Sequence, residues 1–366
     1  MVQLGIDNFL ENFVRRYKDA KIGLVTNMTG VNHRLQPTID LFYEHPDIHL
    51  TALFGPEHGI RGDAKAGEKV ESGRDPYTGL PVHSLYGETK KPTKEMLADV
   101  DMVVIDLQDI GTRYYTYIYT MAYVMQACME ENKEVVILDR PNPISGQNRE
   151  GNLVKEGFFS FIGLYPIPVR HGLTIGELAN LFKHEFGLDC QLTVVPMKDW
   201  SRDLYFDETG LIWVPPSPNS TGLSMCLLYP GTCLFEGTNL SCGRGTTTPF
   251  EIVGSPFIDG YKLAKRFNEK NLEGVIARPI TFVPTYQKFK DELCSGIQLH
   301  ITDKRQINGF KTGVYLLETI AELYPDELTF LDSENKRCHF NLLAGTDELI
   351  DLIFQQKAER FLETCA

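Results

Sequence analysis

The segments DMVVIDL (residues 101–107) and EVVILD (residues 134–139) decide the fold class. Each is a short, continuous run of β-branched and other apolar residues that ends in polar ones, which is typical of a strand buried on both faces. A helical pattern over residues 113–132 separates them. Strands that alternate with helices in this way form parallel sheets covered by helices, so these segments predict a Rossmann-like, doubly wound domain.

The same alternation continues on both sides of these segments. Further strands are expected at 21–27, 49–54 and 192–197, and further helices at 37–45, 93–99 and 174–186. The last helix begins with Thr174 and has Glu177 three residues later, which is the pattern of a capping box. We therefore place residues 1–205 in a Rossmann-like catalytic domain.

Beyond about residue 200 the sequence changes in character. A Pro- and Gly-rich stretch at 213–256 is expected to be irregular, and irregular runs of this length are usually functional in compact proteins. A helix near 258–270, strands near 280–286 and 296–302, and helices near 311–323 and 346–363 are expected to follow. We predict that residues 206–366 form a smaller mixed α+β domain that closes the cleft.

Composition and charge exclude several classes of protein. The 36 Lys and Arg residues against 49 Asp and Glu residues give a net charge of −13, which repels phosphate backbones, so nucleic acid is not an expected partner. No apolar run approaches the roughly 18 residues of a membrane span, so no membrane association is expected. The eight cysteines are scattered without a CxxC pair, which predicts mostly free thiols. No feature of the sequence indicates an oligomeric state.

The amino-terminal segment at residues 1–19 predicts an amphipathic helix. It lacks the cationic start, the continuous apolar core and the small-residue cleavage site of a signal peptide. We therefore expect a cytoplasmic protein. An exported protein whose signal peptide had been removed would show the same start, so export is the alternative.

Polar side chains follow four of the expected strands at the point where each strand ends. Because ligands of parallel sheets bind outside the carboxyl ends of the strands, we expect these residues to form a site at one edge of the sheet. They are Asn27, Glu57, His58, Arg61, Asp106, Gln108, Asp109, Arg113, Asp139, Arg140 and Asn142. Ordinary turn chemistry is the alternative, although chance loops rarely combine carboxylates, histidine and arginine with rigid Gly and Pro so consistently.

The turn PEHG at residues 56–59 is the most specific of these segments. A carboxyl group at the rim of a buried strand is partly desolvated, which raises its pKa and suits Glu57 to donate a proton near neutral pH. The alternative for Glu57 is a helix cap or a salt-bridged carboxylate. His58 either orients a neighbouring group or is a satisfied loop histidine, and the same two interpretations apply to His171 beside Arg170.

The irregular stretch of the second part carries its own polar residues. Its candidates for substrate contact are Asn219, Glu236, Asn239 and Arg244. Arg244 lies in the sequence GRGTT, where glycine and threonine let the backbone and hydroxyl groups approach a ligand closely. A loop of this kind is expected to close over the strand ends of the first domain, and a long solvent-exposed connection is the alternative.

Several mechanisms lack their sequence motifs. There is no GxGxxG after the first strand and no GxxxxGK[ST], so neither a nicotinamide cofactor nor a P-loop is expected. The absence of GxSxG and HExxH argues against a serine nucleophile and a zinc site, and no cofactor or metal is predicted. Carboxylate chemistry remains, as in glycosidic hydrolysis, which needs a protonated acid on the leaving oxygen and a second group at the anomeric centre.

Motifs along nearly the whole chain are similar to those of one family. In order they are LFGPEHGIRGD, GLPVHSLYG, DLQDIGTRYYTYIYTM, LDRPNP, PVRHGLTIGELA, WVPPSPNS and YPGTCLFEGTNLS with GRGTTTPFE. The set resembles the exo-β-N-acetylmuramidases, peptidoglycan hexosaminidases long known as a domain of unknown function. The resemblance implies a Rossmann-like domain, a distinctive carboxyl-terminal domain and a site in the cleft between them. It also implies release of N-acetylmuramic acid (MurNAc) from the non-reducing end of β-1,4-linked MurNAc-GlcNAc fragments, with Glu57 as the catalytic glutamate.

The substrate that the resemblance implies carries a lactyl carboxylate and a 2-acetamido group. An acidic enzyme needs a local cation for the carboxylate, and the candidates are Arg61, Arg113, Arg140, Arg170 and Arg244. In a substrate-assisted route the acetamido carbonyl attacks the anomeric carbon, and Asp106 or Asp109 orients the amide. A direct route through a carboxylate or tyrosine nucleophile is equally open.

The expected partner is therefore a small molecule, a MurNAc-containing peptidoglycan fragment. Two other functions fit the same residues. A non-catalytic muropeptide- or sugar-binding protein would keep the arginine and aromatic contacts but would not need a desolvated Glu57. A metal-dependent muropeptide amidase is the second alternative, and its activity would disappear with a chelator.

Overall fold

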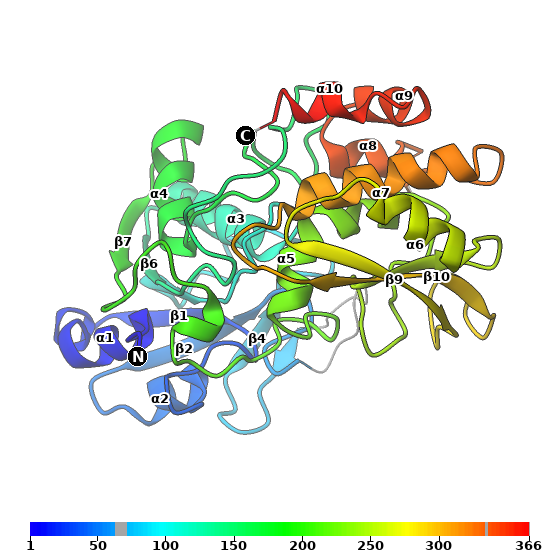
Figure 1. Ribbon diagram of the computed structural model, residues 1–366. Helices are drawn as coiled ribbons and strands as arrows, with labels where there is room; N and C mark the ends of the chain where they lie inside the picture. The colour runs from blue at the N-terminus through cyan, green and yellow to red at the C-terminus, as the bar shows by residue number, and fades with distance from the viewer. Residues whose placement is uncertain (63–71, 334–335, 366) are drawn as a thin grey trace. The chain divides into compact units, whose positions relative to one another are not determined.

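Seven strands form one sheet in the computed structural model, which describes residues 1–62, 72–333 and 336–365. The strands are β1 (Lys21–Thr26), β2 (His49–Gly55), β3 (Gly73–Arg74), β4 (Pro81–Ser84), β5 (Met102–Asp106), β6 (Glu134–Leu138) and β7 (Gln191–Val195). They lie in the order β3-β4-β2-β1-β5-β6-β7, and every neighbouring pair except β3 and β4 is parallel (Figure 1). The predicted Rossmann-like parallel sheet is confirmed.

The direction of strand succession reverses between β1 and β5. From β1 the chain moves outward to β2 and β4, and from β5 it moves to β6 and β7 on the other side. In doubly wound sheets ligands bind at such a reversal, outside the carboxyl ends of the strands. The loops after β1 and β5, together with the loop after the neighbouring β2, are therefore the first place to look for a site.

Helices pack against this sheet. They are α1 (Gly5–Asn12), α2 (Thr38–Glu44), α3 (Tyr117–Glu130) and α4 (Ile175–Phe186), with short 3-10 helices η1 (Val14–Tyr17) and η2 (Phe206–Glu208). Phe9 of α1 and Phe42 of α2 stack with ring centroids 5.3 Å apart, over buried Leu24, Leu53 and Val104 of the strands. Burial of such aromatic and aliphatic side chains holds α1 and α2 against the sheet.

Helix α4 has the expected start, whereas the helix expected at 93–99 is absent. The Thr174 hydroxyl accepts a hydrogen bond from the Glu177 amide, and the Glu177 carboxylate accepts one from the Thr174 amide, which is the predicted capping box. Residues 94–99 form only turns. The prediction of a helix at 93–99 was therefore wrong.

A second, smaller sheet consists of three antiparallel strands in the order β8-β10-β9. Its strands are β8 (Ile252–Ser255), β9 (Val275–Phe282) and β10 (Cys294–Ile301). The helices of this part are α5 (Leu223–Thr232), α6 (Gly260–Asn268), α7 (Gly309–Leu323), α8 (His339–Ala344), α9 (Glu348–Phe354) and α10 (Ala358–Leu362), with η3 (Cys233–Gly237). The predicted smaller α+β part is confirmed, and the single helix expected at 346–363 is divided into α9 and α10.

The stretch at 213–256 is less irregular than its composition suggests. It contains α5, η3 and β8. Pro230 and Gly231, which usually interrupt a helix, lie inside α5. A Cβ atom on Gly231 would lie 2.1 Å from the Gly309 carbonyl oxygen at the start of α7, so the glycine allows the two helices to approach closely. Tertiary packing thus overrides local propensity, and the expectation of a wholly irregular run was wrong.

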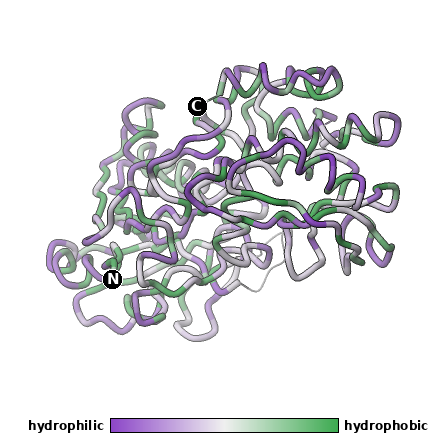
Figure 2. The backbone as a smooth tube through the Cα atoms, in the orientation of Figure 1, coloured by the Kyte–Doolittle hydropathy of each residue, from purple (hydrophilic) through white to green (hydrophobic). Residues whose placement is uncertain are grey.

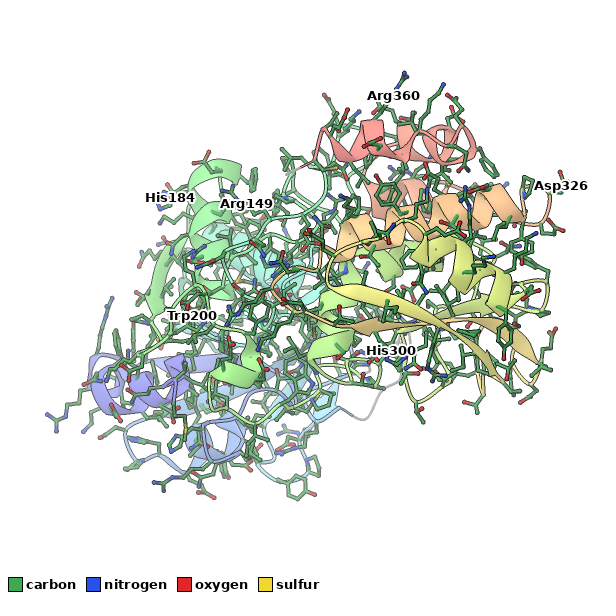
Figure 3. The ribbon with its side chains drawn as sticks, viewed as in Figure 1. Arg149, His184, Trp200, His300, Asp326 and Arg360 are labelled. Atoms are coloured by element: carbon green, nitrogen blue, oxygen red, sulfur yellow. The ribbon has the colours of Figure 1, made fainter. Side chains whose placement is uncertain are left out.

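The chain forms two compact units. The first comprises Met1–Gly111, Tyr115–Gln147 and Gly172–Pro218, and the second comprises Thr112–Tyr114, Asn148–His171 and Asn219–Ala366. Hydrophilic and hydrophobic residues alternate along α9 and α10 (Figure 2), and Arg360, on the exposed side of α10, points outward (Figure 3). All eight cysteines are free, and no helix in the described ranges has the length and apolarity needed to cross a membrane.

Candidate functional site

Glu57 lies two residues after β2, and its side chain is half-buried. Thr116, which precedes α3, donates a hydrogen bond from Oγ1 to Glu57 Oε2 at 3.2 Å. The hydroxyl of Tyr117 lies 3.3 Å from the carbonyl oxygen of Glu57 and 2.6 Å from that of Pro216. The loops after β2 and β5 therefore fix both the backbone and one carboxyl oxygen of Glu57, while part of its side chain remains accessible.

The backbone around Glu57 is a tight turn with local strain. The Gly59 amide donates to the Pro56 carbonyl at 3.0 Å, and His58, the third residue of the turn, has a φ of 74°. A left-handed φ at this position favours glycine, and another residue there costs on the order of 1 kcal/mol. The His58 side chain is buried, so it is positioned to support the turn that presents Glu57.

Two pKa shifts identify the groups around Glu57. Burial raises the pKa of Tyr117 well above its ordinary value, and the charge of Glu57 adds to this shift, whereas the amide of Asn27 opposes it. Desolvation lowers the pKa of Lys90, and the negative charge of Glu57 opposes that shift. The charge of Glu57 therefore acts on both Tyr117 and Lys90, and Asn27 acts on Tyr117.

Asn27, which directly follows β1, offers a hydrogen-bond donor near Tyr117. Its Oδ1 accepts from the amide of Thr29 at 2.9 Å and from the hydroxyl of Thr29 at 2.6 Å. Its Nδ2 is buried and lies near the Tyr117 hydroxyl, but it forms no hydrogen bond of normal geometry with any residue that the structure describes. A buried donor without an acceptor costs about 1–3 kcal/mol, so a ligand oxygen at this position would be bound favourably.

Asp106, at the end of β5, is fully buried and both of its carboxylate oxygens are occupied. Arg140 donates from Nε to Oδ1 at 2.6 Å and from Nη2 to Oδ2 at 2.9 Å, and the Thr38 hydroxyl donates to Oδ2 at 2.5 Å. Arg140 also donates to the Val31 carbonyl at 2.8 Å. These contacts join four segments of the first unit, and a catalytic role for Asp106 stays a prediction.

A pocket lies at the reversal of strand order. Its lining includes Gln108, Arg140 and Trp213. Gln108 donates from Nε2 to two backbone carbonyls at 2.7 and 2.8 Å, and Asp109 Oδ2 accepts from the Gly111 amide at 2.7 Å. Gln108 and Arg140 thus lie at the sheet edge, as the sequence predicts. Trp213 belongs to the motif WVPPSPNS but was not predicted as a site residue.

Asp139 and Asn142, after β6, form local hydrogen bonds. Asp139 Oδ1 accepts from the Gly176 amide at 2.9 Å, and Oδ2 accepts from the Thr174 hydroxyl at 3.0 Å, so this carboxyl group caps α4. Burial raises the pKa of Asp139 to about 6 although these hydrogen bonds oppose the shift. Asn142 bonds to two backbone groups at 2.9 and 3.1 Å. Substrate contact by either residue stays a prediction.

Arg61 is anchored within the first unit by Asp75. Its Nε lies 2.8 Å from Asp75 Oδ1 and its Nη2 lies 3.1 Å from Oδ2, while its guanidinium carbon lies 4.6 Å from the centroid of the Tyr77 ring. Burial raises the pKa of Asp75, but the hydrogen bonds from Arg61 and from the Thr78 amide and hydroxyl outweigh it and lower the pKa to about 2.

Arg113 and Arg170 are buried in the second unit. Arg113 donates to four backbone carbonyls, those of Asn152, Ile167, Leu343 and Ala344. Arg170 lies 2.5 Å from Glu150, whose other carboxylate oxygen accepts from the Phe310 amide at 3.0 Å. His171 is buried beside Arg170. These contacts give both arginines a structural role, and their binding of substrate stays a prediction.

The remaining candidates also lie in the second unit. Asn219 Oδ1 accepts from the Tyr286 hydroxyl at 2.8 Å. Asn239 bonds through its amide to two backbone groups at 2.8 and 3.0 Å. Glu236 and Arg244 form an ion pair between Oε1 and Nε. Glu236 and Arg244 therefore contact each other directly.

Sequence reasoning missed Thr116, Tyr117 and Lys90. The first two lie in the quoted motif DLQDIGTRYYTYIYTM, but hydroxyl groups beside an apolar helix give no distinct signal, and Lys90 lies between strands in a loop. No group of three or more His, Cys, Asp or Glu side chains in the described parts of the chain is arranged to hold a metal ion. The chemistry available at Glu57 is that of a carboxyl group among amide, hydroxyl and ammonium groups.

The fold and the site together define a class of protein: a doubly wound α/β protein with a half-buried glutamate at the carboxyl edge of its parallel sheet. The chain belongs to the exo-β-N-acetylmuramidase NamZ family. Residues 22–224 match the N-terminal domain of this family and residues 227–365 match its C-terminal domain. The resemblance seen in the sequence motifs is confirmed.

Known relatives support this assignment. The chain is 51% identical over 344 residues to a Bacillus subtilis protein named peptidoglycan β-N-acetylmuramidase NamZ, with 94% of this chain and 82% of that protein covered. Two crystal structures of DUF1343 family proteins from Bacteroides fragilis share the fold. One is 39% identical with a TM-score of 0.91, and the other is 31% identical with a TM-score of 0.79; each match covers 99% of this chain and 94% of the other.

Proposed function

We propose that this protein is an exo-acting glycoside hydrolase that releases MurNAc from the non-reducing end of β-1,4-linked MurNAc-GlcNAc peptidoglycan fragments, with Glu57 as the general acid. The observation that carries the proposal is the Glu57 carboxyl group, half-buried at the sheet edge and held by Thr116, in a chain of this family. The net charge of −13 favours a small-molecule substrate over nucleic acid.

The reaction requires one proton transfer at each stage. Protonated Glu57 gives its proton to the glycosidic oxygen as the bond between that oxygen and C1 breaks, so the GlcNAc-bearing fragment leaves as an alcohol. Positive charge develops at C1 and is relieved by the acetamido oxygen or by another nucleophile. In this two-step route, water then adds to C1 and returns a proton to the Glu57 carboxylate, which restores the acid.

Neighbouring groups suit this role. The hydrogen bond from Thr116 fixes one carboxyl oxygen of Glu57, and the hydroxyl of Tyr117, which donates to the Pro216 carbonyl, lies against the turn that carries Glu57. The Nδ2 of Asn27, which forms no hydrogen bond of normal geometry within the described residues, is a donor for a sugar hydroxyl or an acetamido carbonyl. Correct positioning of an acid relative to the leaving oxygen contributes as much to the rate as its acidity.

The test compares two substrates that differ in how much they need an acid. GlcNAc is a poor leaving group, whereas 4-nitrophenol leaves without protonation. We expect Glu57→Gln to slow MurNAc-GlcNAc hydrolysis by at least about a hundredfold and to slow 4-nitrophenyl MurNAc much less. Glu88→Gln makes the same chemical change on an exposed glutamate of the first unit and serves as the matched control.

Other outcomes would redirect the assignment. Equal slowing of both substrates would mean that Glu57 is not the acid, and parental rates on both would remove it from the reaction. Binding of MurNAc without turnover by the parent protein would favour a sugar-binding protein. Release of peptide that stops with a chelator and returns with zinc would favour the metal-dependent muropeptide amidase.

A further inference from the structure

Of the five candidate arginines, Arg244 differs from the others in its hydrogen bonds. The difference is relevant because the substrate of the proposed function carries a carboxylate, which an arginine could bind. Arg61 and Arg140 each direct two nitrogens at a carboxylate of the protein, Arg113 donates to four carbonyls, and Arg170 pairs with a buried glutamate. In Arg244 only Nε has a hydrogen-bond partner among the described residues. Its two terminal nitrogens remain available to a ligand.

The guanidinium group of Arg244 is held in place without using these terminal nitrogens. Glu236 accepts from Nε, and the guanidinium carbon lies 5.0 Å from the centroid of the Phe250 ring. Burial lowers the pKa of Arg244, but the charge and hydrogen bond of Glu236, together with other neighbouring groups, outweigh burial and raise the pKa, so the group stays cationic. A planar group fixed on one edge and on one face presents its other edge in a defined direction, which suits two parallel hydrogen bonds to a carboxylate.

The backbone of the loop is also shaped around Arg244. Gly243 and Gly245, its two neighbours, have φ values of 78° and 82°, and Phe250 has a φ of 63°. A Cβ atom on Gly245 would lie 2.8 Å from the Thr285 amide nitrogen, so a larger residue does not fit there. Left-handed backbone on both sides of one residue, with a strained phenylalanine beneath it, is typical of functional sites, where the fold maintains strain to orient a side chain.

A small pocket with net positive charge adjoins Arg244. It is lined by Glu236, Ser241, Cys242, Arg244, Gln287 and Lys288. Lys288 is held by carbonyls of η3 and the residues after it, so the lining has two cations against one carboxylate in a protein of net charge −13. The cavity of about 40 Å³ holds a few water-sized groups, which is enough for a carboxylate but not for a sugar ring.

We propose that the terminal nitrogens of Arg244 bind the carboxylate of a muramyl group, and that this residue determines the preference for muramyl over glucosaminyl sugars. Glu236 acts as a positioning residue, because it touches only the Nε edge of the guanidinium group. The proposal names the specificity determinant of the proposed function and therefore rests on it. The group recognised is a carboxylate attached to a sugar, and the sugar ring stays outside the pocket.

The experiment measures binding rather than turnover, so that it stands apart from the test of Glu57. N-acetylmuramic acid and its methyl ester are titrated into the full-length Glu57→Gln protein by calorimetry. The ester keeps the shape of the ligand and removes its charge. We expect the acid to bind about 10- to 100-fold more tightly than the ester, as two charge-assisted hydrogen bonds predict, and Arg244→Lys to abolish most of this ratio.

Two further variants control for a merely structural effect. Arg266→Lys changes an exposed arginine of the same unit that pairs with Glu322, and it should leave the acid-to-ester ratio unchanged. Glu236→Gln keeps an oxygen for Nε but removes the competing charge, so we expect it to raise the ratio. A ratio near one in the parent, an unchanged ratio in Arg244→Lys, or a lowered ratio in Glu236→Gln would overturn the proposal, whether or not the protein hydrolyses its substrate.

Discussion

Replacement of Asp106 by asparagine distinguishes a structural carboxylate from a catalytic one. Asp106 is fully buried and balances the charge of Arg140 through hydrogen bonds of 2.6 and 2.9 Å, with a third from Thr38 at 2.5 Å. Asparagine has nearly the same shape, but it carries no charge and places an N–H group where one carboxylate oxygen accepted hydrogen bonds. The guanidinium of Arg140, which is also buried, is then left without a counter-ion.

The magnitude follows from this burial. Removal of one partner from a buried ion pair typically costs about 3–5 kcal/mol, because the other charge stays desolvated. We therefore expect Asp106→Asn to lower the free energy of unfolding by about 3–5 kcal/mol. Arg140→Met added to this variant should recover part of the loss, since it removes the unpaired charge. A double-mutant cycle on these two positions reports the interaction directly.

Urea unfolding followed by circular dichroism gives the stability, and kcat on MurNAc-GlcNAc, corrected for the folded fraction, gives the activity. A structural carboxylate predicts a large loss of stability with kcat per folded molecule within about tenfold of the parent. If stability stayed within about 0.5 kcal/mol while kcat fell by a thousandfold or more, Asp106 would act in the reaction and the reasoning from its contacts would be refuted.

Two further predictions concern the start of α4. The pKa of Asp139 is about 6 in the folded protein and about 3.9 for an ordinary aspartate, so the folded state binds more protons between these values. The free energy of unfolding should therefore fall by roughly 2 kcal/mol as pH rises from 4 to 6. Unfolding at several pH values should show a flatter profile for Asp139→Asn, and an equally steep one would contradict the assignment. Thr174→Ala removes the acceptor for the Glu177 amide and should lower the free energy of unfolding in urea by about 1 kcal/mol. Thr174→Ser keeps the acceptor and should lower it much less. Equal losses in the two variants would argue against the cap.

The central strands of the parallel sheet could be predicted because they are almost entirely buried. β1, β5 and β6 begin and end within one residue of the apolar runs that predicted them, since burial on both faces leaves no polar residue to blur the pattern. The short strand β3 at the edge of the sheet and its neighbour β4 were not predicted, because two exposed residues and four mostly half-buried ones give no periodic signal. Helix α5 was hidden by Pro230 and Gly231, whose fit depends on a glycine contact with distant α7.

Part of the site was predictable from topology. Asn27 was selected because it follows a strand, and Glu57 also because of the PEHG turn and the family resemblance; in the structure both act on Tyr117. Asn27 and Glu57 lie near each other because the parallel strands β1 and β2 end at the same edge of the sheet. The hydrogen bond from Thr116 was not predictable, since it depends on the rotation of the first turn of α3 and not on any residue pattern.

The arginines show why residue type alone does not identify a binding group. Each of the five lies in a motif shared with the family, yet four find their acceptors inside the protein. Some acceptors are far along the chain: Arg113 donates to the Leu343 and Ala344 carbonyls across 230 and 231 residues. A buried guanidinium must be satisfied, and the fold supplies carbonyls or carboxylates to do so. Arg244 is satisfied on one edge only, by Glu236 eight residues away. Its remaining hydrogen-bond capacity, together with the left-handed glycines on both sides, is the basis for the proposal that Arg244 binds a ligand.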